Sequence, residues 1–173
     1  MSAVLASWNR YRTPVLIDIA LLAALYLLPT VSHLVALPLY KLEPMRIALI
    51  VALLFTQRAN AYLVAWTIPL ASFVLSGHPE LFKAVLIGAE YSILVAVYGF
   101  LAQRWKGSPF AALLVAILAG KILYYTLKYL SLNAGLLAGN LVSTPVLTQV
   151  VLATGTAAVF AFVLNRWQDQ SPR

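Results

Sequence analysis

Over residues 81–102 the chain runs LFKAVLIGAEYSILVAVYGFLA, and only Lys83 and Glu90 in this stretch are charged. A helix that crosses a lipid bilayer needs about 20 predominantly apolar residues. The stretch is long enough, and it is followed by the polar segment QRWKGSP. It therefore predicts a membrane-spanning helix that carries one carboxylate near its middle.

The rest of the chain has the same apolar character. Hydrophobic residues make up 62% of the 173 residues and charged residues 10%, whereas soluble domains have about 45–50% and about 25%. Because lipid must be the solvent of such a chain, we expect an all-α integral membrane bundle of about six transmembrane helices, forming a single domain over residues 1–173. The expected helices cover residues 15–37, 45–55, 61–75, 81–102, 110–130 and 145–164, of which the second is short for a span.

The positive charges indicate how this bundle is oriented. With an even number of spans both termini lie on one side, and that side carries Arg10, Arg12, Arg58, Arg104, Lys106, Arg166 and Arg173. The opposite side would carry mainly Lys41, Arg46 and Lys83. Cytoplasmic loops of membrane proteins collect Lys and Arg, so we expect both termini to be cytoplasmic (N-in/C-in).

Ionisable residues inside the expected spans are the main functional signal, because each costs about 2.5–3.5 kcal/mol to insert. Lys121 and Lys128 are seven residues apart and share one face of a helix with Tyr125. Glu90 falls at about the same depth as Lys121. One interpretation is an outward-open cavity for a small anionic ligand. The other is a Glu90–Lys121 ion pair that ties two helices, with Lys128 reaching to the lipid headgroups.

On the first interpretation, the candidate ligand-binding residues are Glu90, Tyr91, Lys121, Tyr125, Lys128 and Asn133. The sequence contains no cysteine, no pairing of Ser with His and Asp, and no Gly-rich phosphate loop. Its two histidines do not make a metal site, and no basic run is long enough to bind nucleic acid. We therefore expect neither an enzyme nor a cofactor, a metal centre or a nucleic-acid partner.

Two further features point to a family. Ala20 and Ala24 are four residues apart, a spacing that allows close helix packing inside the bundle or against a partner. Residues 76–107 run SGHPELFKAVLIGAEYSILVAVYGFLAQRWKG and combine a Gly-Pro turn, a mid-span Glu and the pair Tyr98-Gly99. With its size and six expected spans, the chain resembles the substrate-binding S component of an energy-coupling-factor (ECF) vitamin transporter.

The resemblance implies a specific function and set of partners. Such a protein sits in the bacterial or archaeal cytoplasmic membrane and captures a vitamin or other micronutrient from outside. It has no ATPase of its own and docks through its first helix, here by Ala20 and Ala24, on an EcfT-like membrane coupling subunit that carries two cytoplasmic ATPases. Each family member binds a different ligand, so the ligand-site residues rest on the polarity argument alone.

Two other functions remain open. A cell-shape scaffold of the MreD type has a similar size and topology, and it would bind no small molecule. A stand-alone channel or secondary transporter usually shows inverted repeats and broken helices near the midplane, and the sequence contains no internal repeat.

Overall fold

The computed structural model describes residues 15, 16, 19–21, 23, 24, 43–77, 79–105, 107–142 and 144–170. From residue 43 onward it contains the helices α2 (Pro44–Phe55), α3 (Arg58–Ser76), α4 (Leu81–Arg104), α5 (Pro109–Asn133) and α6 (Val146–Gln170). The residues described between positions 15 and 24 are also helical, and no strand occurs in the described ranges. The all-α prediction is therefore confirmed there. Most of the first expected span, residues 15–37, lies outside the described residues.

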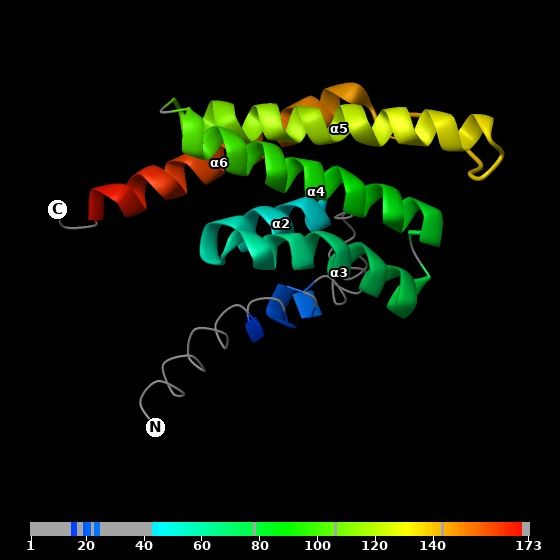
Figure 1. The fold of residues 1–173 in the computed structure, drawn as a ribbon, viewed down its shortest axis with the longest axis horizontal. Helices are drawn as coiled ribbons and strands as arrows, with labels where there is room; N and C mark the ends of the chain where they lie inside the picture. The colour runs from blue at the N-terminus through cyan, green and yellow to red at the C-terminus, as the bar shows by residue number, and fades with distance from the viewer. Residues whose placement is uncertain are drawn as a thin grey trace.

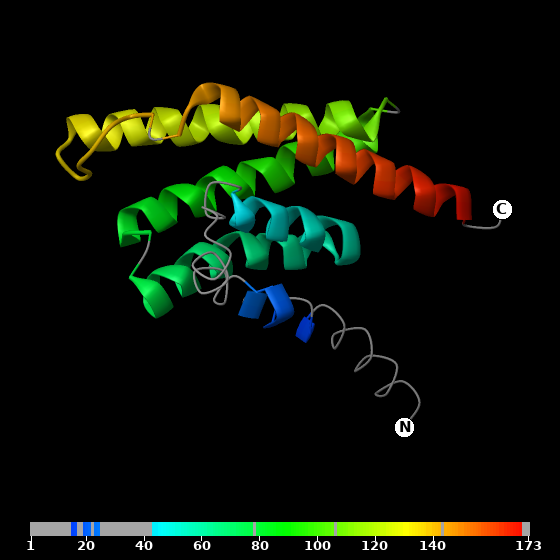
Figure 2. The ribbon, with the colours of Figure 1, turned by 180° about the vertical axis from the view of Figure 1, so that it is seen from behind.

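The helices run back and forth along the long axis of the molecule (Figure 1). The turns that join α2 to α3 and α4 to α5 lie at one end of the bundle. The α3–α4 turn and the loop between α5 and α6 lie at the other end (Figure 1). Neighbouring helices in sequence pack together, and α6 lies across α5 (Figure 2).

Turn residues set several of the helix boundaries. Pro44 and Pro109 occupy the first turns of α2 and α5, where the missing N–H of proline is not needed. At the end of α3, Gly77 has a φ of 68°, the left-handed conformation that commonly ends a helix. The expected helices after residue 44 are confirmed with boundaries that differ by at most three residues, except that α6 continues six residues beyond the expected end at 164.

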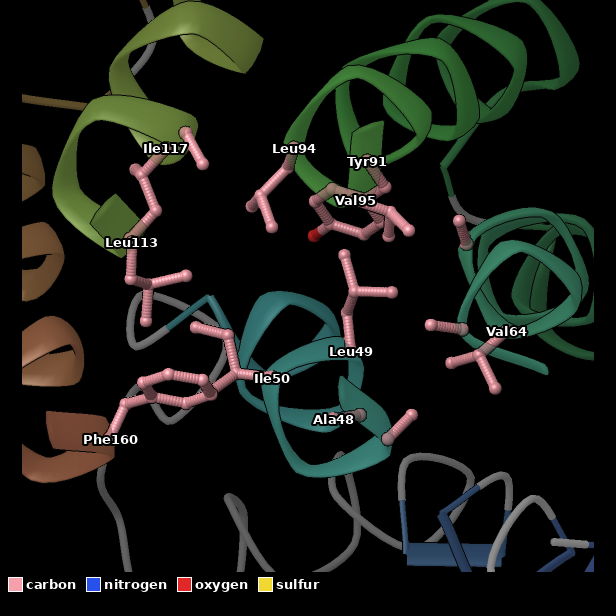
Figure 3. Packing of buried hydrophobic residues seen from close by; sticks show 14 of the residues in the cluster. Ala48, Leu49, Ile50, Val64, Tyr91, Leu94, Val95, Leu113, Ile117 and Phe160 are labelled. Atoms are coloured by element: carbon pink, nitrogen blue, oxygen red, sulfur yellow. The ribbon is translucent and has the colours of Figure 1, made fainter. Parts of the chain in front are cut away.

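The apolar core is organised around α2, which contacts α3, α4 and α6. Leu49 of α2 is fully buried and lies near Leu94 of α4 (Figure 3). Val64 of α3 and Phe160 of α6 approach α2 from other sides (Figure 3). Among α2 to α6, the shortest helix is therefore an internal one.

Four helices, α3 to α6, are long and apolar enough to cross a membrane. The prediction of about six spans is thus supported in part, because α2 has 12 residues and a length of about 18 Å, against a bilayer core of about 30 Å. The long helices also turn large apolar side chains outward, among them Val74, Ile122 and Leu147. Such a surface is suited to lipid contact, and the chain is a multi-pass membrane protein.

Candidate functional site

Four charged side chains meet inside the bundle and form what we call the buried charge network: Glu43, Arg46, Glu90 and Lys121. Arg46 Nη2 donates to Glu90 Oε1 at 2.8 Å, and Arg46 Nη1 pairs with Glu43 Oε2. Lys121 Nζ lies 3.1 Å from Glu43 Oε1 and 3.4 Å from Glu90 Oε1. The network thus links α4 and α5 to the start of α2.

The expected proximity of Glu90 and Lys121 is observed, but the position of Arg46 differs from the expectation. The charge pattern placed Arg46 among the outer charges, whereas its side chain is only 2% exposed. The reason is the shortness of α2, which begins beside the middle of α4 rather than at its end (Figure 1). Glu90 lies roughly 14 Å along α4 from Leu81, and Arg46 meets it there.

Local backbone geometry at two positions makes the network possible. Glu43 has a φ of 51°, a left-handed conformation that is unfavourable for a residue other than glycine. In that conformation its carboxylate reaches both Arg46 and Lys121. Gly120 lets α5 approach α4 closely, since a Cβ at this position would lie 2.8 Å from the Glu90 carbonyl oxygen.

The network is balanced in charge, with two carboxylates facing two cations. Moving a charge out of water is costly, and a buried pair is tolerated when its partners and hydrogen bonds compensate that cost. Arg46 and Glu90, the two most buried members, compensate each other directly. The cations of the network are therefore already occupied by carboxylates of the same chain, which makes it a connection between helices rather than a vacant anion site.

A second polar region lies at the end of the bundle that carries the α5–α6 loop. We call it the loop pocket, a cavity of about 170 Å³ lined by Glu80, Lys83, Lys128, Leu137, Ala138, Gly139 and Asn140. Lys128 is 5% exposed, and its Nζ donates to the Leu141 carbonyl oxygen at 2.8 Å. The α5–α6 loop therefore closes over this lysine.

Gln149 ties the same loop to the helices below it. Its Oε1 accepts a hydrogen bond from the Tyr125 hydroxyl at 2.8 Å, and its Nε2 donates to the Thr144 carbonyl oxygen at 2.8 Å. Tyr124, one residue before Tyr125, is buried, and its ring lies 5.9 Å from Lys128 Nζ. The Tyr124 ring and the Leu141 carbonyl oxygen thus flank Lys128, one of the two lysines of the stripe predicted on α5.

The six candidate ligand-binding residues divide among several environments. Glu90 and Lys121 belong to the buried charge network, and Lys128 belongs to the loop pocket. Tyr91 lies in the apolar core with Leu94 and Val95 (Figure 3). Tyr125 bonds Gln149 beside the α5–α6 loop, and Asn133 is exposed at the end of α5.

The structure adds polar residues that the sequence reasoning did not assign to a site. These are Glu43, Arg46 and Lys83. Lys83 lies in the first turn of α4, and Glu80 immediately precedes this helix, beside the Gly-Pro turn. Their position next to that turn was the sequence signal that could have assigned them to a site. Ala20 and Ala24 are exposed on the first helical segment. No cluster of metal-ligating side chains occurs among the residues that the structure describes.

Comparison of the chain with protein-family models, with curated proteins and with solved structures gave no match.

Proposed function

We propose that this protein is the membrane-embedded substrate-binding subunit of an ECF-type importer in a bacterial or archaeal cytoplasmic membrane. It captures a small, anionic micronutrient or vitamin from outside and delivers it to an EcfT-like coupling subunit with two cytoplasmic ATPases. The observation that carries the proposal is the loop pocket, where a lysine on α4 and a buried lysine on α5 line one cavity at one end of the bundle.

The arrangement of the remaining polar groups supports this proposal. A capture subunit needs a rigid frame beneath its site, and the buried charge network joins the helices that line the loop pocket. It also needs a surface free for a partner. The exposed Ala20 and Ala24 offer a small-residue surface of the kind that packs closely against another membrane helix.

A scaffold of the MreD type is the second candidate, and the charge balance of the network favours it. A network whose cations and carboxylates pair with one another balances its own charge without a ligand. Such a scaffold would rely on the network for helix packing alone. The scaffold function does not explain why two lysines line a cavity.

Intact-complex mass spectrometry of the gently purified full chain separates the two functions. A capture subunit is expected to retain one small molecule per chain, or to take one up from a panel of vitamins and nucleobases. The mass of that molecule identifies it and tests whether it is an anion. A spectrum that stays free of ligand throughout the panel contradicts the proposal and favours the scaffold.

A further inference from the structure

The two polar regions of the bundle differ in charge balance. In the buried charge network, Arg46 and Lys121 are matched by Glu43 and Glu90. The loop pocket has two lysines and one carboxylate, that of Glu80. An excess positive charge at the wall of a cavity attracts an anion, and the attraction is strongest where water is partly excluded.

Neither lysine of the loop pocket is neutralised by the part of the chain that the structure describes. Lys83 and Lys128 form no ion pair with any described residue. Lys128 uses one donor on the Leu141 carbonyl oxygen, and an ammonium group has three. Glu80 precedes α4, makes no side-chain capping bond and forms no ion pair with any described residue, and its residue lines the cavity.

The size and walls of the loop pocket limit what it can hold. Its volume of about 170 Å³ is close to that of an engineered cavity of about 150 Å³ that takes benzene. Leu137 and Ala138 add apolar wall, while Asn140 adds an amide. The space suits one small ring or short chain with a polar group, and it is too small for a nucleotide.

We propose that the loop pocket binds the carboxylate or phosphate group of a small soluble organic acid through Lys83 and Lys128. Glu80 and Asn140 are then placed to accept hydrogen bonds from donors on the rest of the same molecule. The inference names a substrate class and rests on the proposed function for its biological meaning. It assigns ligand charge recognition to Lys83 and Lys128 and leaves Lys121 to the buried charge network.

The test uses two probes that match in shape and differ in charge, benzoate and benzylamine. The full chain is purified in detergent, depleted of lipid and kept in a phosphate-free buffer. Its thermal unfolding midpoint is measured against the concentration of each probe, because a ligand that binds the folded state raises this midpoint. Benzoate is expected to raise the midpoint by a few degrees, and benzylamine is expected to leave it unchanged. Equal shifts with both probes would overturn the inference.

Three variants test the charges one at a time. Lys83→Met is expected to weaken benzoate binding about tenfold, the effect of one charge-assisted hydrogen bond. Glu80→Gln removes the opposing carboxylate and is expected to tighten binding severalfold. Arg104→Met, a cation at the opposite end of α4, is the matched control and is expected to change nothing. If Lys83→Met and Arg104→Met bind benzoate equally, the inference is wrong.

Lys128→Met also removes the hydrogen bond to the Leu141 carbonyl oxygen of the loop, so it can weaken binding by loosening the loop. Its benzoate affinity is therefore compared with that of Lys83→Met under conditions in which the two variants have the same unfolding midpoint. A lipid headgroup offers the same anionic chemistry, and intact-complex mass spectra distinguish it. A phospholipid retained by the native chain and lost from Lys83→Met would overturn the assignment to a soluble acid.

The same spectra distinguish the inference from the proposed function. A small molecule retained by both lysine variants as strongly as by the native chain would leave the proposed function standing and remove the loop pocket as its site. Lysine-dependent benzoate binding in a chain that takes up none of the vitamins or nucleobases would support the pocket and contradict the importer.

Discussion

At the scale of single residues, Arg46 and Glu90 are mutually dependent. Their side chains are 2% and 4% exposed, and their hydrogen bond measures 2.8 Å. Removing one partner of a buried pair leaves an uncompensated charge and costs on the order of 3–5 kcal/mol. We expect Arg46→Met to lower the free energy of unfolding by that amount, and the double variant Arg46→Met/Glu90→Gln to recover more than half of it.

The measurement is loss of helical circular dichroism on heating in detergent, carried out for the native chain, both single variants and the double variant. Arg104→Gln is the control, because this arginine is exposed and substitution of a surface charge usually changes stability by less than about 0.5 kcal/mol. Losses that simply add in the double variant would show that the two charges do not depend on each other.

Glycines on two helices provide a second prediction at this scale. A methyl group on Gly120 would lie 2.8 Å from the Glu90 carbonyl oxygen, and backbone cannot move aside as a side chain can. We expect Gly120→Ala to destabilise the bundle by about 1–3 kcal/mol, as overpacking does. Gly155 of α6 has open space where its Cβ would be, so Gly155→Ala is the matched control. It should be neutral or stabilising by up to about 1 kcal/mol, the helix preference of alanine over glycine.

Both glycine variants are compared with the native chain by thermal unfolding in the same detergent. If Gly120→Ala is as stable as Gly155→Ala, the close approach of α4 and α5 at Glu90 is not a feature of the protein in solution.

At the scale of elements, the α5–α6 loop depends on Gln149. This side chain bonds Tyr125 on α5 and the Thr144 carbonyl of the loop. Each bond contributes about 1 kcal/mol. We therefore expect Gln149→Leu to speed amide hydrogen exchange in the loop by about tenfold or more while the cores of α4 and α5 stay protected.

Thr154→Val supplies the control for this prediction. The Thr154 hydroxyl bonds only to the backbone of its own helix, so its loss removes a hydrogen bond on α6 without touching the loop. Equal exchange in the two variants would mean that Gln149 does not hold the loop.

The sequence predicted the long helices well because hydropathy reports directly on which segments are immersed in lipid. Residues 81–102 and 110–130 correspond to α4, Leu81–Arg104, and α5, Pro109–Asn133. The small differences at the ends arise because a helix need not stop at the membrane boundary. Its backbone hydrogen bonds continue through polar residues such as Gln103 and Arg104.

The candidate site was harder to predict, and Arg46 shows why. The charge rule places every arginine beside an expected span on one face of the membrane or the other. That rule holds only if each helix reaches both faces, and α2 is too short to do so. The residues around Arg46 show no pattern that predicts its burial. Arg46 is buried because of where α2 begins in three dimensions, which the local sequence does not encode. By contrast, the Glu90–Lys121 proximity follows from the depths of two full-length helices, which can be counted.

At the scale of the whole molecule, the decisive property is which end of the bundle faces outside. The α2–α3 and α4–α5 turns share one end, and the α5–α6 loop lies at the other (Figure 1). Arg58 and Arg104 lie at the first end, beside those turns. Because positive charge accumulates on the cytoplasmic side, the loop pocket is expected to face outward.

Single introduced cysteines test this orientation, because the native chain has no cysteine and therefore gives no background labelling. Leu136, Gln57 and Ser108 are all exposed and lie between helices. In intact cells that express the full chain, we expect a membrane-impermeant maleimide to label Leu136→Cys. Gln57→Cys and Ser108→Cys should be labelled only after the cells are permeabilised. The reverse pattern would place the loop pocket in the cytoplasm and rule out capture from outside. The packing of α2 to α6 and the buried charge network would stand unchanged, because neither depends on which side of the membrane the loop pocket faces.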